Sequence, residues 1–501
     1  MKKRRMEFLF VIVLMLSIYV VFFSGFGQFV KLVFISVYGF IIFVSIFSLM
    51  LENRSAQHTL LWMYVLLFFP VFGYIFYLYS GQLYLKGYLF KSKRKNDREE
   101  WRKLLKSEES PDLSFLQDNQ RAFAEFSSHI SVTKISTNST TKILKNGAET
   151  FSEIKQRLKK AKRYIHMEYY IFRSDRLGKE IIDILINKAR EGVEVLFLFD
   201  AVGSLQLASD DIKLLERAGV KVQSFLPLKY GFFNQKFNFR NHRKIIVIDG
   251  EVGFVGGLNV GIEYLGESDK FGFWRDTHML LEGEAVHTLH TVFLLDWEYV
   301  SRKMMLEEYP SAEYGSNQVD GAVHVVASGP DTGQDIMGDL YYSMMASATK
   351  SIWIATPYFV PSEPIRTALR VAARRGLEVR IMVPEKNDGF LTQYATRSYF
   401  PELLRCGVEI YSYKKGFLHQ KILIVDGNMA SIGTANMDMR SFHLNFEVNV
   451  FLIGSSSIRD LIVHYEEDIK DSVKLSPVEF YKRGIVKRTK ESFARLFSGV
   501  L

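Results

Sequence analysis

Two polar motifs with the same internal spacing occur in this chain, and they contain side chains suited to nucleophilic and acid–base chemistry. Each motif has the order His-x-Lys, then Asp, then Gly and Asn. The second motif repeats the spacing of the first throughout, so a chance match at this many positions is negligible. The members are His242, Lys244, Asp249, Gly256, Gly257 and Asn259 in the first motif, and His419, Lys421, Asp426, Gly433 and Asn436 in the second.

Together the two motifs supply the groups needed to transfer a phosphodiester. One imidazole attacks phosphorus and carries the phosphoryl group, while the other protonates the leaving alkoxide and then deprotonates the incoming alcohol. Lys244, Lys421, Asn259 and Asn436 are expected to bind the non-bridging oxygens as negative charge redistributes. This interpretation requires both histidines to face one phosphorus atom.

A carboxylate must also hold the ring of the nucleophilic histidine in the correct tautomer. Asp276, in Trp-Arg-Asp, and Glu447, in Asn-Phe-Glu, lie downstream of the two motifs and are the candidates. Asp249 and Asp426 leave two alternatives open, because each precedes a glycine at a predicted turn. They either hold local backbone or a salt bridge, or they contact the substrate.

A metal site is the competing interpretation of these polar residues. His with Asp can bind a divalent cation, but a lysine two residues after each histidine would repel one, and the sequence has no His/Cys/carboxylate cluster. We therefore predict chemistry that needs neither a metal nor another cofactor. Loss of activity in a chelator, restored by one specific divalent cation, would contradict this prediction.

The elements that position these residues can be predicted from the apolar runs around them. Each His-x-Lys lies at the start of a predicted β-strand, so its two side chains project from one face. The Asp-Gly pair that ends each run is a strong turn signal, and the chain is expected to return and bring Asn near His. The returning strands are predicted at residues 252–255 and 429–432, and Gly256, Gly257 and Gly433 are predicted to let the backbone approach the substrate closely.

Strand and helix patterns upstream of each motif are duplicated as well. They predict an α/β fold with a largely parallel sheet in each half. Residues 307–333 are rich in Gly, Ser, Pro and acidic residues, so we expect the boundary there, between catalytic domains at 126–315 and 316–501. The predicted elements are strands 164–172 and 193–200 around helix 179–190, and strands 351–359 and 377–383 around helix 364–375.

The N-terminal residues 1–90 are predicted to form a membrane anchor with two to three hydrophobic segments. The uncharged runs 8–30, 32–51 and 59–85 each reach the roughly 20 residues that cross a bilayer. The first run is too long for a signal peptide and has no small-x-small cleavage site. Basic residues precede the first run and follow the third, which favours two crossings of the cell membrane, a re-entrant or interfacial third segment around Pro70 and Gly73, and a cytoplasmic catalytic body.

The overall composition of the 501-residue chain fits a basic globular body joined to a lipid-embedded segment. The formal charge is +9, which favours anionic partners such as nucleic acid, acidic membranes or phosphate compounds. Cys406 is the only cysteine, so no intrachain disulfide forms. Residues 91–125 are predicted to be a charged linker, with a solvated helix over 97–110. The basic C-terminal residues 481–501 form either an interfacial amphipathic helix or a helix packed on the catalytic body.

The duplicated pattern H-x-K-x4-D followed by G-G/S/T-x-N resembles the phospholipase D superfamily, from about Ile143 to the end of the chain. Several segments are similar to bacterial cardiolipin synthases, including the membrane segment around residues 61–81. The others are residues 238–244, 257–261, 271–278, 416–419, 434–442 and 445–447. The resemblance implies two duplicated phospholipase D-like α/β/α domains with a shared central active site, preceded by transmembrane helices.

The resemblance also implies a reaction and its catalytic residues. The active-site residues of the family correspond to His242, Lys244 and Asp249 and to His419, Lys421 and Asp426. The implied reaction joins two phosphatidylglycerols into cardiolipin and glycerol through a phosphohistidine, with His242 as the expected nucleophile and His419 as general acid and base. The expected partners are anionic phospholipid and the membrane, and not nucleic acid. A phospholipase D-type hydrolase and a non-catalytic lipid-binding protein are the alternatives.

Overall fold

The computed structural model describes residues 12, 15–16, 19–20, 25–51, 56–69, 72–73, 77, 89–106, 111–227, 236, 238–310, 320–332 and 335–498. The chain divides into two compact units, residues 1–89 and residues 90–501. Each unit is described by itself.

In the N-terminal unit, helix α2 (Gln28–Met50) is long and apolar enough to cross a membrane. It has a mean hydropathy of 2.5 and is the one such helix among the described residues. Helix α3 (Ala56–Phe68) contains a shorter apolar stretch, Thr59–Phe68. The predicted segment 32–51 is therefore a helix. The predicted segments 8–30 and 59–85 lie only partly within the described residues, and Pro70, in the predicted re-entrant or interfacial segment, lies outside them.

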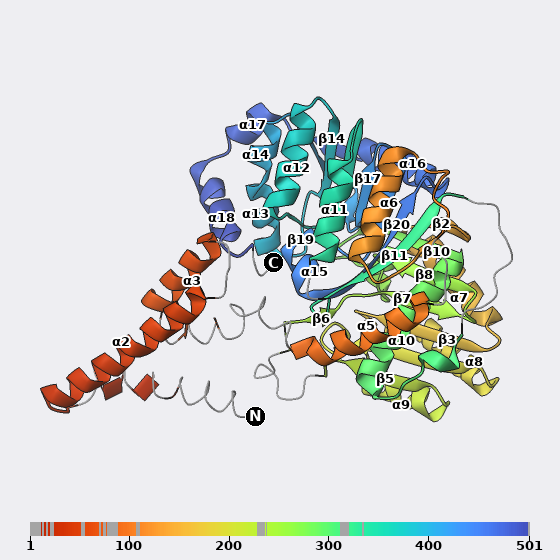
Figure 1. Cartoon of the computed structure of the whole chain (residues 1–501), viewed down its shortest axis with the longest axis horizontal. Helices are drawn as coiled ribbons and strands as arrows, with labels where there is room; N and C mark the ends of the chain where they lie inside the picture. The colour runs from red at the N-terminus through yellow and green to blue at the C-terminus, as the bar shows by residue number, and fades with distance from the viewer. Residues whose placement is uncertain are drawn as a thin grey trace. The chain divides into compact units, whose positions relative to one another are not determined.

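The first half of the catalytic unit contains a seven-stranded sheet (Figure 1). Its strand order is β2-β10-β8-β7-β3-β4-β5. The strands are β2 (Ser139–Lys145), β3 (Tyr164–Tyr169), β4 (Glu194–Asp200), β5 (Lys221–Phe225), β7 (Ile245–Ile248), β8 (Val252–Gly256) and β10 (Thr277–Gly283). The helices of this half are α7 (Asn146–Lys160), α8 (Arg176–Arg190), α9 (Ser209–Arg217) and α10 (Glu284–Ser301).

The second half repeats this arrangement in a larger sheet, whose central path is β1-β11-β20-β18-β17-β12-β14-β15-β21. Its strands are β1 (Ile135–Ser136), β11 (Ala322–Ser328), β12 (Ser351–Ala355), β14 (Glu378–Pro384), β15 (Glu409–Tyr413), β17 (Ile422–Val425), β18 (Met429–Gly433), β20 (Asn445–Ile453) and β21 (Ser472–Lys474). Its helices are α11 (Ile336–Ala346), α12 (Glu363–Arg374), α13 (Phe390–Ser398), α14 (Phe400–Leu404), α16 (Ser457–Lys470), α17 (Pro477–Tyr481) and α18 (Ile485–Arg495).

The prediction of a largely parallel sheet is wrong for both halves. In the first sheet only β3-β4-β5 are parallel, and β7, β8, β10 and β2 are antiparallel to their neighbours. The cause is the tight hairpin after each motif strand, since a short turn joins only antiparallel strands. Asp249 and Gly250 form this turn with φ of 56° and 73°, and Asp426 and Gly427 repeat it with 53° and 68°.

Each sheet lies between two layers of helices, so each half is an α/β/α sandwich. Strand β3 is buried along its whole length, as expected for a strand covered on both faces. Its Ile165 and Met167 belong to the core cluster that includes α8, while the ring of His166 stacks on Phe293 of α10, with 5.0 Å between centroids. Alternate residues therefore face opposite helix layers.

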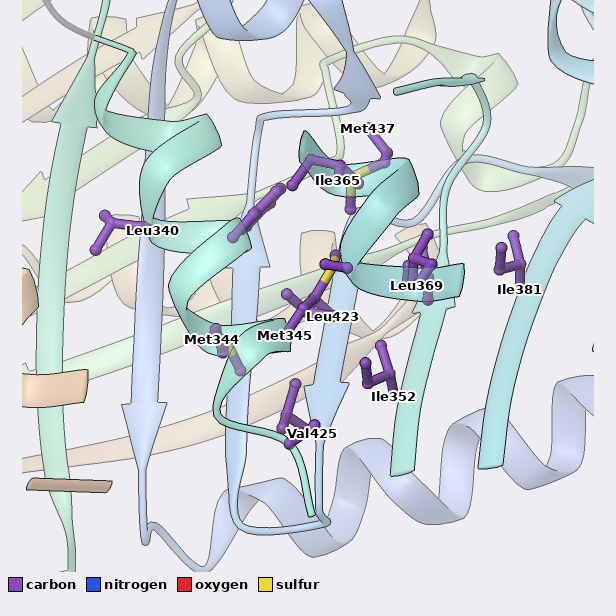
Figure 2. Close-up of a cluster of buried hydrophobic side chains, with 14 of the residues drawn as sticks. Leu340, Met344, Met345, Ile352, Ile365, Leu369, Ile381, Leu423, Val425 and Met437 are labelled. Atoms are coloured by element: carbon purple, nitrogen blue, oxygen red, sulfur yellow. The ribbon is translucent and has the colours of Figure 1, made fainter. Parts of the chain in front are cut away.

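Figure 2 shows the corresponding core of the second half, where α11 and α12 cover one face of the sheet. Ile365 and Leu369 lie four residues apart on α12 and so project from one side of it. They pack towards Ile352 of β12 and Ile381 of β14 in the same buried cluster. This packing fixes the sheet whose strand β17 begins directly after Lys421.

Helix α6 (Asp118–Ile130) and strand β1 belong to the second half, although they precede the first half in the sequence. Strand β1 pairs with β11, and the ring of Phe123 contacts Phe451 of β20 at 5.8 Å between centroids. This arrangement differs from the predicted division at residues 125 and 126, because the first sheet begins only at β2.

Helix α5 (Lys91–Lys106) confirms a helix within the predicted segment 97–110. One side of this helix is buried, which corrects the prediction that the segment is a solvated linker. Lys93 is 3% exposed, and its Nζ lies 3.0 Å from Asp296 Oδ1 of α10 and 3.2 Å from Asp331 Oδ2. Trp101 is also buried. A buried lysine requires such partners, because an unpaired charge is costly to remove from water. Residues 107–110 lie outside the described part of the chain.

Candidate active site

Two short parallel bridges join the halves immediately before each motif histidine. Strand β6 (Arg240–Asn241) pairs with the start of β20, and β16 (Gly416–Leu418) pairs with β9 (Phe273–Arg275). The bridges continue into the motifs themselves. The His242 backbone N–H donates to Phe446 O at 2.9 Å, and that of His419 donates to Arg275 O at 2.7 Å. Each histidine is thus positioned by the opposite half.

The two histidines are paired crosswise with the two predicted carboxylates. His242 Nδ1 lies 2.9 Å and 3.0 Å from the carboxylate oxygens of Glu447, and His419 Nδ1 lies 2.7 Å from Asp276 Oδ2. All four side chains are buried. Because an ionised carboxylate only accepts hydrogen bonds, we assign a proton to each Nδ1, which leaves Nε2 for chemistry. The sequence pointed to Asp276 and Glu447 but not to the half that each one serves.

The two motif lysines lie beside their histidines and within electrostatic reach of the opposite ones. Lys244 Nζ donates to His242 O, and Lys421 Nζ donates to His419 O, both at 2.5 Å. Burial, together with Lys244 and Lys421, lowers the pKa of His242 to about 4 against the opposing effect of Glu447. Burial, with Lys421 and Lys244, lowers the pKa of His419 to about 3. Charges from both motifs therefore act on each imidazole.

These surroundings suit an anionic ligand. Burial lowers the pKa of Lys244 to about 7 and that of Lys421 to about 8, and the two ammonium groups repel each other. Neutral imidazoles are available for nucleophilic attack near pH 7, since protonation would occupy the lone pair. A phosphodiester anion bound between the lysines would favour their charged forms.

We expect anion binding to draw a proton onto Lys244. Sulfate is a suitable probe because it stays dianionic over this pH range. Its affinity should fall by up to about tenfold per pH unit above pH 7, because the ammonium must then be formed on binding. Calorimetry of the detergent-solubilised full chain from pH 6 to 9 measures the sulfate affinity. Repeating it in buffers of different ionisation enthalpy measures the number of protons taken up on binding. Lys244→Met should lose the pH dependence between about pH 7 and 8 and keep the part above about pH 8 that comes from Lys421, whereas a constant wild-type affinity would contradict the lowered pKa.

The two motif asparagines are buried but differ in their contacts. Asn259 Oδ1 accepts from Ile171 N at 3.0 Å, and its Nδ2 donates to the Tyr264 hydroxyl at 3.2 Å. The Oδ1 of Asn436 has no hydrogen-bond partner within the described part of the chain. Their predicted role in binding phosphate oxygens, which requires the Nδ2 donors, stays a prediction.

Protein atoms lie so close to the motif glycines that a side chain would not fit at these positions. Their role in letting the backbone approach the substrate stays a prediction. A Cβ on Gly257 would lie 2.1 Å from Asp276 Oδ1, and one on Gly256 would lie 2.6 Å from His278 Cα. Gly433 is equally close to Asn449, whose Oδ1 would lie 2.4 Å from an added Cβ. A side chain on Gly257 would displace the carboxylate that orients His419.

Asp249 and Asp426 lie at the far ends of their strands from the histidines, and their contacts favour the first of the two alternatives. The Asp249 carboxylate accepts hydrogen bonds from the backbone N–H groups of residues 162, 163 and 164, at 2.7 to 2.9 Å. Asp426 accepts from those of residues 349, 350 and 351 and from the Thr349 hydroxyl. They anchor the chain that enters β3 and β12, so the structure does not bring these two members of the predicted catalytic set to the others.

Asp426→Ala is accordingly expected to reduce stability more than catalysis. Losing the acceptor for three backbone N–H groups, two of them on exposed residues and one on a half-buried residue, should cost about 1–3 kcal/mol, while turnover of the folded enzyme stays within about tenfold of the wild type. Thermal unfolding in detergent and activity well below the transition measure these separately. Asp183→Ala, at an exposed position of α8, is the matched control. Loss of turnover with an unchanged melting temperature would instead indicate a direct catalytic role.

Several positioning residues were missed by sequence reasoning. The middle residue of each His-x-Lys is bound to an aspartate of a long helix: Arg243 pairs with Asp296 of α10, and Gln420 Nε2 donates to Asp468 of α16 at 2.8 Å. The ring of Tyr170 contacts His242, with 4.9 Å between centroids. A long hydrogen-bond donor at the middle position of both motifs was the available signal.

Comparisons with known proteins show the family to which the chain belongs. Residues 154–293 and 341–470 match the family described as "Cardiolipin synthase, PLD-like domain", and residues 39–82 match "Phospholipase_D-nuclease N-terminal". The chain is 58% identical to "Probable cardiolipin synthase YwiE" of Bacillus subtilis over the full length of both chains. It is 45% identical to "Cardiolipin synthase" of Halalkalibacterium halodurans, again with both chains covered in full.

A solved structure shares the fold at low sequence identity. Phosphatidylserine synthase of Haemophilus influenzae superposes with a TM-score of 0.60 at 14% identity, over 77% of this chain and 100% of the other. The fold is thus the duplicated α/β/α architecture, and the high identity to the curated relatives specifies the family. On its motifs, its shared site and these matches, the chain belongs to the bacterial cardiolipin synthases of the phospholipase D superfamily, which are phosphatidyltransferases.

Proposed function

We propose that this enzyme transfers the phosphatidyl group of one phosphatidylglycerol to a second one, forming cardiolipin and glycerol. The observation that carries the proposal is the crosswise pair of buried histidine–carboxylate contacts, His242 with Glu447 and His419 with Asp276, flanked by two lysines. Membership of the cardiolipin synthase family supports the same reaction.

In the first step, His242 Nε2 attacks the phosphorus of the donor lipid, while Glu447 holds the Nδ1 proton. The bond from phosphorus to the glycerol headgroup oxygen breaks, and His419 gives that oxygen a proton. The bound phosphodiester anion counters the lysine charges that lower the His419 pKa, so the imidazolium becomes accessible in the complex. Lys244 and Lys421 hold the non-bridging oxygens. The products are free glycerol and a phosphatidyl-histidine.

In the second step, a hydroxyl of another phosphatidylglycerol replaces the departed glycerol. His419 Nε2 removes the hydroxyl proton, the oxygen attacks phosphorus, and the bond to His242 breaks, which regenerates the neutral His242 and the protonated His419 that began the cycle. Water at about 55 M competes for the same intermediate, so a buried site at a lipid surface favours transfer over hydrolysis.

We further propose that the catalytic body faces the cytoplasm and that the anchor crosses the cell membrane twice. Lys and Arg are concentrated at residues 2–5 and 86–95, on both sides of the hydrophobic segments. Protease added outside intact spheroplasts should then leave tags at both ends of the chain uncut. Cleavage of one tag alone would require an odd number of crossings.

Mass spectrometry of the lipid products tests the reaction directly. Purified full-length protein in phosphatidylglycerol vesicles should give cardiolipin and glycerol, with rates unchanged by a chelator. If phosphatidic acid and glycerol were the main products, the enzyme would be the alternative hydrolase and not a synthase. A protein that forms neither product, but binds the vesicles, would correspond to the non-catalytic alternative.

A further inference from the structure

The C-terminal helix α18 packs along α13 through one narrow face. Glu491 is 2% exposed, and its carboxylate accepts from Arg483 Nε at 2.8 Å and lies 3.5 Å from Arg397 Nε. Ala494 is buried beside it, and just beyond the helix Ser498 accepts from the Tyr399 hydroxyl at 2.8 Å. The helix is therefore part of the catalytic body, which was one of the two alternatives for residues 481–501.

The apolar residues of this helix face away from the body that it packs on. The exposed fractions are 71% for Ile485, 64% for Val486, 59% for Phe493 and 53% for Leu496. At about 100° per residue, these four project within an arc of about 100°, on roughly the opposite side from Ala494 and Glu491. A helix that only packs on a soluble body buries its apolar side, so this orientation requires another partner.

The exposed surface extends onto the start of α13, where Phe390 is 66% exposed and lies 5.8 Å from Lys490 Nζ. We call Phe390, Ile485, Val486, Phe493 and Leu496 the interfacial patch. Basic side chains surround it, and all of the following are exposed: Lys482, Lys487, Arg488, Lys490 and Arg495. An apolar stripe between basic residues is complementary to an anionic lipid surface, where acyl chains lie below phosphate headgroups.

The interfacial patch is also linked to the second motif through short contacts. Thr396 of α13 accepts from Phe359 N at 3.2 Å, and Phe359 pairs with Met437, the residue after Asn436. Phe390 comes two residues after Asp388, which accepts from the Tyr358 hydroxyl at 2.6 Å. The negative charge of Asp388 raises the pKa of Lys421, against the larger effect of burial. The patch and the catalytic groups are thus connected through direct contacts within the second half.

We propose that the interfacial patch inserts into the surface of an anionic phospholipid bilayer and holds the second motif at the level of the lipid headgroups. It gives the catalytic body a membrane contact of its own, in addition to the anchor. The role of this contact in catalysis rests on the proposed function. The contact itself can form without turnover.

Depth-dependent quenching in the full chain tests the contact. In a Cys406→Ser background, Phe493→Cys carries a fluorescent dye, and the protein is placed in single-copy nanodiscs that contain phosphatidylglycerol and nitroxide-labelled lipid. We expect the nitroxide acyl chains to quench the dye at least about twofold. A dye at Leu214→Cys, an exposed apolar position on α9, should be quenched far less. Equal, weak quenching at both positions would overturn the proposal.

Turnover provides a second readout. Ile485→Glu with Phe493→Glu should slow cardiolipin formation in bilayers by about tenfold, and leave the reaction of dissolved short-chain phosphatidylglycerol within about twofold of the wild type. Leu214→Glu is the matched control. If the dye at residue 493 were shielded only in discs with two copies, the patch would be a self-association surface and the proposal would be wrong. Quenching without any cardiolipin formation would support the membrane contact of the interfacial patch and contradict the proposed function.

Discussion

Replacing either His242 or His419 with alanine should reduce cardiolipin formation by about 10⁴-fold or more, because the nucleophile or the proton donor is then missing from a site that needs both. Cardiolipin formation in phosphatidylglycerol vesicles measures this loss. His129→Ala, at an exposed position of α6, should keep full activity. Full activity in both active-site variants would exclude the proposed chemistry and leave only a lipid-binding role.

The same two variants distinguish the nucleophile from the acid and base. A phosphatidyl ester of p-nitrophenol has a leaving group that needs no proton, so His419→Ala should still release one equivalent of nitrophenol and accumulate the phosphatidyl-histidine. His242→Ala should give no such burst. The covalent adduct can be detected by mass spectrometry after digestion under alkaline conditions. If only His242→Ala gave a burst, His419 would be the nucleophile and His242 the general acid and base.

Glu447→Gln and Asp276→Asn test the crosswise pairing, and each should lower turnover by about 10²- to 10⁴-fold. Glu447→Gln should suppress the nitrophenol burst, because it removes the group that orients His242. Asp276→Asn should retain the burst and impair the steps that need His419. Pairing within each half would predict the reverse assignment, so the burst experiment separates the two arrangements.

The pH profile of Glu447→Gln provides a readout that a loss of packing would not produce. The Glu447 charge raises the pKa of His242 against the larger effect of burial, which lowers it to about 4. Attack requires neutral His242, so activity rises with pH through this pKa. Removing the carboxylate charge lowers the pKa further, and the acid limb of kcat/KM should therefore move to lower pH. A shift to higher pH would contradict the contact with Glu447.

A double-substitution test completes this prediction. Glu447→Gln should cost little more in a His242→Ala background, because the residue acts through an imidazole that is already absent. In a His419→Ala background it should cause a further loss of the remaining nitrophenol burst. Coupling of this kind is expected between residues in direct contact and is small between distant ones.

The sequence by itself determined the reacting groups and the local elements that carry them. Residue type and repeated spacing are properties of short segments, so His242, Lys244, His419 and Lys421 could be identified without coordinates. The Asp-Gly turns and returning strands β8 and β18 followed for the same reason, since a tight hairpin needs only local residues. The apolar helix α2 also followed from a single run of residues.

Only the tertiary structure decided which half orients each histidine, why Gly257 must lack a side chain, and that Lys93 is buried in the catalytic body. It also showed that the Asp426 carboxylate accepts hydrogen bonds from backbone N–H groups and that the apolar side of α18 faces outward. These features depend on contacts between residues far apart in the chain, such as His242 with Glu447. Sequence spacing carries no information on how two sheets dock, because docking is set by the packing of whole surfaces.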